Sequence, residues 1–225
     1  MNITFTEEKR GEIQRIQRQF RNQLSEAQIK QGTAQAINGV MQRSISKIKK
    51  EMKKEYNINS KYLSRIAIVS PKAKQNELYA GIRMRTAPIP IIGFKPKQSG
   101  SSISVTIKKG KTTIIRDSFI TTMPAGNHKT KEYTSEHKGV YAHGKYDGKE
   151  FIYNKNLPKG SKLRAERSKK NDPKPFATTQ LVTTDPFSMG TYKTVASEIQ
   201  SFMGSEVVKR VEGILRSKVN KIAKK

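Results

Sequence analysis

Residues 101–115 read SSISVTIKKGKTTII, and this stretch decides the fold class. The apolar residues Ile103, Val105 and Ile107 alternate with polar residues, which is the period of a strand with one buried face. A short basic turn containing Gly110 follows, and a second run of β-branched residues leads back. This order predicts an antiparallel β-hairpin. The stretch contains no nucleophile elbow, no phosphate-binding glycine loop and no metal-ligand spacing, so we interpret it as architecture.

The segments around the hairpin predict further strands. Residues 119–123 read FITTM, and Pro88 and Pro90 keep residues 87–92 extended at a sheet edge or in a connector. Other short apolar runs with strand character lie at residues 78–85, 140–143 and 151–153. We therefore expect a central antiparallel sheet.

Two long amphipathic stretches precede and follow this region in the sequence. In residues 7–55 the apolar positions recur at spacings of three and four, as in a helix that buries one face. Ser25 to Gln28 has the spacing of a capping box, so this stretch forms one helix or two with a corner, and we favour a break. A short helix is expected from Lys61 to about Val69. The final helix, capped by Thr191, carries an apolar stripe of Val195, Ile199, Phe202, Val208, Val211, Leu215, Val219 and Ile222.

The expected fold class is α+β, with the central antiparallel sheet flanked by a long N-terminal helix, or helix pair, and a long C-terminal helix. We expect one folded domain overall. Along the chain its parts are an N-terminal helical region at 1–70, an antiparallel β region at 71–156, a basic mobile loop at 157–175, and a connector with the C-terminal helix at 176–225.

The apolar stripes of the helices have two interpretations. Such faces usually cover the sheet of their own subunit. Here, however, the two helical parts hold more apolar stripe than one small sheet can bury, which indicates packing against neighbouring copies. The candidate subunit-interface residues are Ile37, Met41, Ile45, Val208, Val211 and Leu215.

The charge of the chain is strongly basic. Lys and Arg number 45 against 18 Asp and Glu, which gives a formal net charge of +27. This charge attracts polyanions strongly, with salt dependence and without reading a base sequence. No zinc finger, RNP aromatic pattern or homeodomain signature is present, so nucleic acid would be contacted at its phosphates. Trp, Cys and long apolar runs are absent, so we expect no membrane contact and no thiol chemistry.

Basic residues of the two helical stretches mostly lie opposite the apolar stripes. They form either a solvated face or a surface that faces phosphates. The residues concerned are Arg15, Arg18, Arg21, Lys47, Lys50 and Lys54 in the first stretch and Lys209, Arg216 and Lys221 in the last.

We expect no metal, no cofactor and no catalytic group. His128, His137 and His143 lie in one lysine-rich segment, and because their spacing matches no zincin pattern we interpret them as solvated loop histidines. The carboxylates of the segment are scattered among lysines, which indicates charge balance and not an acid–base pair. A nuclease ranks third among the hypotheses, because two-metal phosphoryl chemistry needs clustered carboxylates.

An ordered set of short motifs resembles the minor tail protein Z family of long-tailed bacteriophages. The resemblance covers most of the chain, although Arg116-Asp117-Ser118 stands where many members have Pro-Gly-Ala, and residues 157–175 look like an insertion. The motifs are, in order, Ala36-Ile37-Asn38, Glu55-Tyr56-Asn57-Ile58, Ile91-Ile92-Gly93-Phe94, Lys109-Gly110-Lys111, Phe119-Ile120-Thr121-Thr122-Met123, Gly139-Val140-Tyr141, Leu181-Val182 and Asp185-Pro186-Phe187-Ser188.

The resemblance implies a structural virion protein without catalysis. Such a protein completes the head-proximal end of the tail beside the terminator and takes part in head-to-tail joining. It is expected to form a homo-oligomeric ring, with sixfold symmetry, around the DNA path, and to contact the tail terminator and neighbouring neck or connector proteins. Its expected location is the virion, and the host cytoplasm during assembly. The alternative is a nonspecific double-stranded nucleic-acid-binding protein that acts outside the virion.

Within this framework, basic residues at two places become candidate contacts with DNA phosphates or with a neighbouring subunit. They are Lys108, Lys109 and Lys111 in the hairpin turn and Arg164, Arg167, Lys169 and Lys170 in the basic loop. An ordinary solvated hairpin tip is the competing interpretation of the turn.

Overall fold

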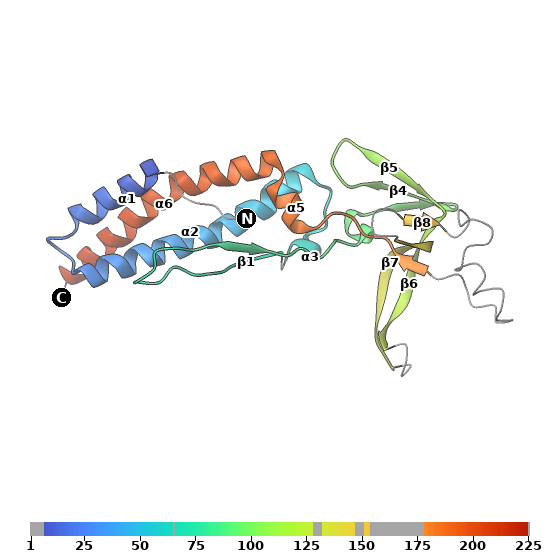
Figure 1. Cartoon of the computed structure of the whole chain (residues 1–225), viewed down its shortest axis with the longest axis horizontal. Coiled ribbons are helices and arrows are strands. Elements are labelled where there is room, and N and C mark those ends of the chain that lie inside the picture. The colour runs from blue at the N-terminus through green and yellow to red at the C-terminus, as the bar shows by residue number, and fades with distance from the viewer. Residues whose placement is uncertain (1–6, 65, 128–131, 147–150, 154–177, 225) are drawn as a thin grey trace. The chain divides into compact units, whose positions relative to one another are not determined.

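The computed structural model describes residues 7–64, 66–127, 132–146, 151–153 and 178–224, and the described chain is α+β as predicted (Figure 1). The expected mobile loop at 157–175 lies outside the described residues. The chain divides into two compact units. Unit 1 consists of Met1–Glu55, Tyr62–Ala87 and Thr184–Lys225, and unit 2 of Tyr56–Lys61 and Pro88–Thr183. The expected boundaries of consecutive regions along the chain stay a prediction.

The first helical stretch breaks into two helices, as favoured from the sequence. α1 spans Glu7–Gln19 and α2 spans Glu26–Glu55. The capping box forms at the start of α2, where the Ser25 N–H donates to Gln28 Oε1 at 2.9 Å and the Gln28 N–H donates to Ser25 Oγ at 3.3 Å. The two side chains satisfy backbone N–H groups that the first turn of α2 leaves unpaired, and this sets the corner.

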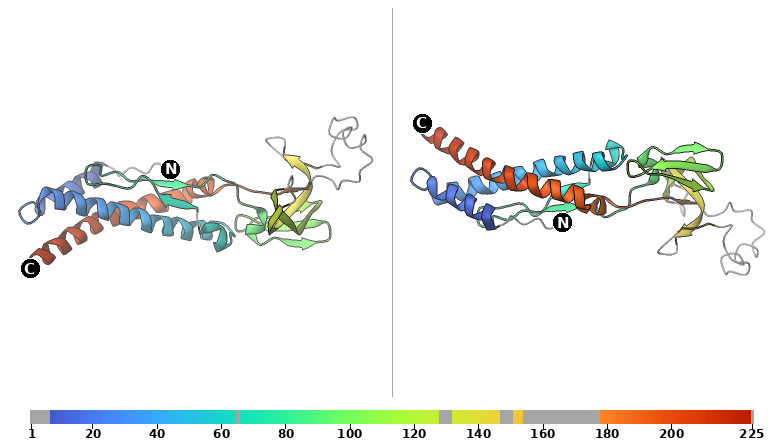
Figure 2. Two further views of the ribbon diagram at one scale, coloured as in Figure 1. Left: turned by 90° about the horizontal axis from the view of Figure 1, so that it is seen from below. Right: turned by 90° about the horizontal axis from the view of Figure 1, so that it is seen from above.

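α2 packs antiparallel against α6, which spans Lys193–Ile222. Gln31 and Lys218 meet near one end of the pair, with 3.0 Å between Oε1 and Nζ, while Lys47 and Glu198 meet near the other, at 3.7 Å. In both views of Figure 2 the two helices cross each other at an angle. Their backbones approach closely at Gly32, where an added Cβ would stand 2.7 Å from Leu215 Cδ2.

The buried line of α6 differs from the predicted stripe. Its buried residues recur every four positions: Val195, Ile199, Met203, Val207, Val211 and Leu215. Because four exceeds 3.6 residues per turn, the buried line moves around the helix by about 40° at each step. α6 therefore turns successive sides toward the elements it contacts, which are α5, α2 and α1. Phe202 and Val208 are only half-buried as a result, and Ile222 is exposed.

The predicted cap of the last helix is wrong. A separate helix, α5, spans Pro186–Thr191, and Asp185 caps it by accepting the Ser188 N–H at 2.9 Å. Thr191 belongs to α5, where its hydroxyl donates to the Phe187 carbonyl at 2.9 Å. Tyr192 precedes α6 and makes no side-chain capping hydrogen bond.

The predicted helix from Lys61 to Val69 is also wrong over most of its length. α3 covers only Ser60–Leu63, and residues Ala67–Val69 form strand β1, which pairs antiparallel with β2 (Ile82–Met84). Three of the last four residues of the expected helix are β-branched, which favours a strand once a partner is present. Ile82 and Met84 are buried, and β1 packs against α2.

Unit 2 is built from two small antiparallel sheets, so the strands of the chain do not join into the single sheet that was expected. The first contains β3 (Lys97–Ser99), β4 (Ser102–Thr106) and β5 (Thr112–Arg116). The second contains β6 (Ser118–Asn127), β7 (Glu132–Tyr146), β8 (Phe151–Tyr153) and β9 (Thr178–Gln180). The predicted hairpin is therefore confirmed as β4–β5, and the predicted strands at 119–123, 140–143 and 151–153 lie in β6, β7 and β8.

The core of unit 2 explains two further motifs. Phe94 lies in the short 3₁₀ helix η1 (Ile91–Phe94), which replaces the end of the segment expected to be extended, and it is fully buried. Hydrogen bonds hold the segment that leads into η1, since the Thr183 N–H donates to the Ile89 carbonyl at 2.9 Å and the Ile91 N–H donates to the Leu181 carbonyl at 3.0 Å. On β7, Gly139 leaves no room for a side chain, because an added Cβ would stand 2.7 Å from Gln180 Nε2.

Candidate phosphate-binding surface

The turn of the β4–β5 hairpin presents two lysines to solvent. The Lys111 N–H donates to the Lys108 carbonyl at 3.2 Å, and Gly110 has φ +81°, a left-handed conformation that favours glycine. Lys109 and Lys111 are exposed, whereas Lys108 is half-buried. The three candidate lysines of the turn are thus brought together at one tip, where Lys109 and Lys111 are the ones open to a partner.

The hairpin stands on a fixed base within unit 2. Tyr56 forms a β-bridge with Lys108, and the Asn57 N–H donates to the Ile107 carbonyl at 2.9 Å. Asn57 Nδ2 donates to the Phe94 carbonyl at 3.3 Å, which ties the same segment to η1. Tyr56 and Phe94 are buried. Two of the motifs noted in the sequence therefore meet beneath the hairpin and hold it.

One face of the β3–β4–β5 sheet is buried and the other carries cations and hydroxyls. Side chains at directly paired positions share a face. Ile103, Val105 and Ile115 lie on the buried face, because Ile103 pairs with Ile115. On the opposite face, the described positions hold no carboxylate. These positions are Lys97, Ser99, Ser102, Ser104, Thr106, Thr112, Ile114 and Arg116, and we call them the hydroxyl face.

The chemistry of the hydroxyl face suits phosphate groups. Lys97 and Arg116 are exposed. Lys97 of β3 pairs with Ser104 of the central strand β4, and Arg116 of β5 pairs with Ser102 of the same strand. Arg, Lys, Ser and Thr side chains supply most contacts to nucleic-acid backbones. Sequence reasoning missed Lys97 and Arg116. No local sequence signal places Lys97 on this face, because its place depends on the pairing of Lys97 with Ser104, whereas alternation with the neighbouring Ile115 points to Arg116.

The candidate residues Arg164, Arg167, Lys169 and Lys170 lie outside the described residues. The helix-face candidates lie inside unit 1. Ile37, Met41, Ile45, Val211 and Leu215 are buried by the packing of their own chain, and Val208 is half-buried. A contact between copies at these positions would require the helices of one chain to separate, and it stays a prediction.

Several helical cations are engaged by carboxylates. Glu51 of α2 is buried at 4% exposure, and its two oxygens lie 3.0 Å from Lys47 Nζ and 2.8 Å from Lys54 Nζ. Burial opposes ionisation of Glu51, but the two ammonium groups outweigh burial, so the pKa of this carboxyl lies below its ordinary value. Lys47 and Lys54 thus hold the Glu51 carboxylate, a structural role that their spacings of four and three residues from Glu51 signal in the sequence. The choice between a solvated and a phosphate-facing surface stays a prediction.

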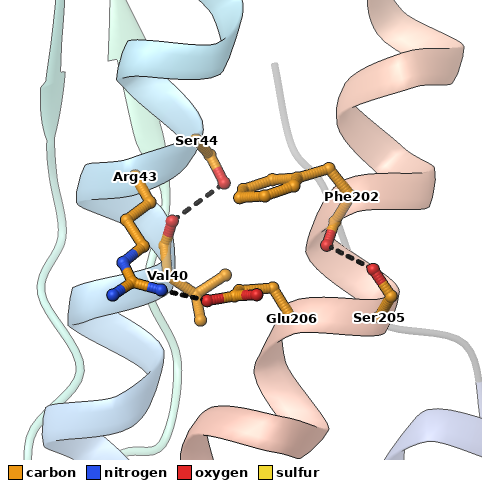
Figure 3. A network of polar contacts seen from close by, with 6 residues as sticks. All are labelled: Val40, Arg43, Ser44, Phe202, Ser205 and Glu206. Atoms are coloured by element: carbon orange, nitrogen blue, oxygen red, sulfur yellow. Dashed lines mark hydrogen bonds and ion pairs between the residues drawn. The ribbon is translucent and has the colours of Figure 1, made fainter.

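The seam between α2 and α6 contains another such pair. Figure 3 shows Arg43 of α2 joined to Glu206 of α6, while the Phe202 ring points from α6 toward Ser44. The Ser44 hydroxyl donates to the Val40 carbonyl at 2.9 Å and so needs no partner from α6. The Arg43–Glu206 ion pair therefore links α2 and α6 at the rim of the seam, beside the Phe202 ring.

The described residues contain no group of three or more His, Asp or Glu side chains that could hold a metal. His137 and His143 lie on strand β7, not in loops as interpreted from the sequence, and His128 lies outside the described residues. Among the described helices, none combines the length and the apolar character that crossing a membrane requires.

The basic charge and the cationic sheet face suit the binding of anionic groups. Residues 16–171 match the family model of Prophage minor tail protein Z (GPZ), which is more than half of the chain. The chain belongs to this family, and it is accordingly a structural component of the bacteriophage tail. No curated protein and no solved structure matches the chain.

Proposed function

We propose that this protein completes the head-proximal end of the tail and takes part in joining tail to head. In this proposal it forms a homo-oligomeric ring, with sixfold symmetry, around the DNA path. Its neighbours are the tail terminator and the neck or connector proteins, and it enters the virion after assembly in the host cytoplasm. It performs no catalysis.

One observation carries the proposal. In this member of a tail-protein family, the described positions of the hydroxyl face carry cations and no carboxylate, and the adjoining hairpin turn is basic. A ring around a DNA conduit needs attraction to phosphate without recognition of bases, and lysine, arginine and hydroxyl donors supply it. The buried base formed by Tyr56 and Phe94 holds this face in one conformation, as a repeated subunit requires.

A reconstruction of intact virions tests the proposal. We expect density for the chain as a ring at the head-proximal end of the tail, with a copy number that quantitative mass spectrometry of purified particles confirms. Density in the capsid shell, or absence of the chain from purified particles, would overturn it.

A genetic experiment tests the joining role separately. A phage with an early stop codon in this gene should give unjoined heads and tails in negative-stain micrographs. The wild-type chain supplied in trans should restore joined particles. Normal particles in the absence of the chain would contradict the joining role.

The second candidate function is nonspecific binding of double-stranded nucleic acid outside the virion, which the net charge of +27 favours. It predicts a protein that is monomeric on DNA in infected cells and missing from purified particles. The same mass-spectrometric measurement on particles separates the two functions.

A further inference from the structure

The outward face of α1 differs from the other helical surfaces of unit 1. Ile13 and Ile16 are buried, and Gln17 Nε2 donates to Thr33 Oγ1 of α2 at 2.9 Å, so these residues define the inner face. At 3.6 residues per turn, Arg15 and Arg18 lie about 60° apart on the opposite side. Both are exposed, as are Gln14 and Gln19 beside them.

Arg15 and Arg18 on this face lack a carboxylate partner, unlike several cations elsewhere in the unit. Lys9 pairs with Glu12, Lys30 with Glu26 and Arg216 with Glu212, at 3.0, 2.7 and 2.8 Å. Among the described residues, Arg15 and Arg18 are in no ion pair.

Arg21 extends the row into the turn between α1 and α2, where it is exposed. It lies near Glu26, but the Glu26 carboxylate forms its ion pair with Lys30. We call Gln14, Arg15, Arg18, Gln19 and Arg21 the arginine face.

The composition of the arginine face indicates its ligand. Guanidinium and amide groups are hydrogen-bond donors to phosphate oxygens, and the neighbouring carboxylates Glu12 and Glu26 are paired with Lys9 and Lys30. A protein partner would be expected to bury an apolar centre, which these residues do not offer, and single strands are usually held by exposed aromatic rings, which are also missing from the face. With a rise of 1.5 Å per residue within α1, Arg15 and Arg18 lie about 4.5 Å apart along the helix axis, roughly one phosphate interval of one strand along a duplex axis.

We propose that the arginine face binds the phosphate backbone of double-stranded nucleic acid without reading its sequence. The arginine face lies in unit 1, whereas the hydroxyl face lies in unit 2. The inference goes beyond the proposed role in the virion, because binding at the arginine face requires neither a ring nor a neighbouring tail protein.

Fluorescence anisotropy with a labelled duplex of arbitrary sequence tests the site on the full chain. Each phosphate contact contributes about 0.9 to the slope of log K against log salt concentration. The variant R15Q/R18Q/R21Q should therefore bind at least about tenfold more weakly near 0.1 M salt and show a slope smaller by about 2 to 3. The matched control K72Q/K74Q/R83Q removes the same charge from exposed positions of unit 1. It should reduce the slope far less.

Circular dichroism and thermal unfolding of each variant verify the fold, and the single variants R15Q and R18Q give the same readout if the triple variant does not fold. Equal losses in the triple variant and its control would overturn the site, because they would show a dependence on net charge alone. Polyglutamate is the probe for an acidic protein partner. If it bound with the same arginine dependence as the duplex, the assignment to nucleic acid would be wrong. None of these outcomes depends on where the protein lies in the virion, so this inference and the proposed function can fail separately.

Discussion

Asn38 of α2 and Ala73 form a reciprocal pair of hydrogen bonds. Asn38 Nδ2 donates to the Ala73 carbonyl at 2.9 Å, and the Ala73 N–H donates to Asn38 Oδ1 at 2.8 Å. The side chain thereby acts as a short piece of backbone and fixes the segment that leads from β1 to β2 onto the helix. This contact gives the asparagine of the Ala36-Ile37-Asn38 motif a structural role.

Replacing Asn38 tests this role. N38A leaves one N–H and one carbonyl of the partly buried Ala73 backbone without partners, so we expect the free energy of unfolding to fall by about 1 to 3 kcal/mol. Urea unfolding followed by circular dichroism measures it. The control Q35A, on an exposed position of the same helix, should change stability little. Equal stability of the two variants would contradict the clamp.

Two helical glycines should respond to alanine in opposite directions. At Gly213 an added Cβ meets no atom within 4 Å, so G213A should gain about 0.5 to 1 kcal/mol of stability from helix propensity. At Gly32 the added Cβ would stand 2.7 Å from Leu215 Cδ2 in the packed seam, and overpacking there costs about 1 to 3 kcal/mol. Thermal unfolding should show a raised Tm for G213A and a lowered one for G32A. A raised Tm for both would mean that the seam relaxes freely.

Glu51 should make stability depend on pH. Its pKa is lower in the folded chain than its ordinary value, because the contacts with Lys54 and Lys47 outweigh burial. A lowered folded pKa stabilises the fold fully above the ordinary carboxyl pKa, and this stabilisation is lost as pH falls through the folded pKa. E51Q should therefore show a flatter fall in unfolding free energy on acidification than the wild type.

At neutral pH, E51Q removes the carboxylate that Lys54 and Lys47 share, so we expect a small loss of stability, because Lys54 is exposed and Lys47 keeps Glu198 nearby. The control E77Q removes an exposed carboxylate from a turn and should keep the wild-type pH profile. If E51Q and E77Q gave the same profile, Glu51 would not be the group responsible.

The hydroxyl face should contribute to DNA binding measurably. The variant K97Q/R116Q removes two cations that share this face, so its salt slope should be smaller than that of the wild type by about 1.8. The same anisotropy assay measures it, with K72Q/K74Q as the charge-matched control. A slope equal to that of the control would exclude the hydroxyl face as a phosphate contact.

The hairpin and the corner between α1 and α2 could be predicted because their signals are local. Alternation around Ile103 and the capping spacing of Ser25 and Gln28 depend on neighbours within a few residues, and the structure confirms both. The strand at Ala67–Val69 could not be predicted from local signals. Its partner strand begins at Ile82, and Asn38 holds the segment between the two strands. Contacts between residues far apart in the sequence overrode a local helix signal there.

The candidate phosphate-binding surface was likewise only partly predictable from the sequence. The lysines of the hairpin turn were found from composition, whereas Lys97 and Arg116 gained their place only through the pairing register of three strands. Lys47 and Lys54 looked like part of a cationic face, and the structure shows that both pair with the buried Glu51, although Lys54 stays exposed.

The sequence by itself determined the α+β class, the strongly basic charge and the membership in the tail-protein family, because these depend on composition, periodicity and ordered motifs. Only the tertiary structure decided which cations are neutralised and which remain open. That outcome depends on which carboxylates the packing brings within about 4 Å of each cation, the range of an ion pair. Arg15 and Arg18 illustrate this. The sequence left them as either a solvated or a phosphate-facing surface, and the structure adds that they are in no ion pair among the described residues.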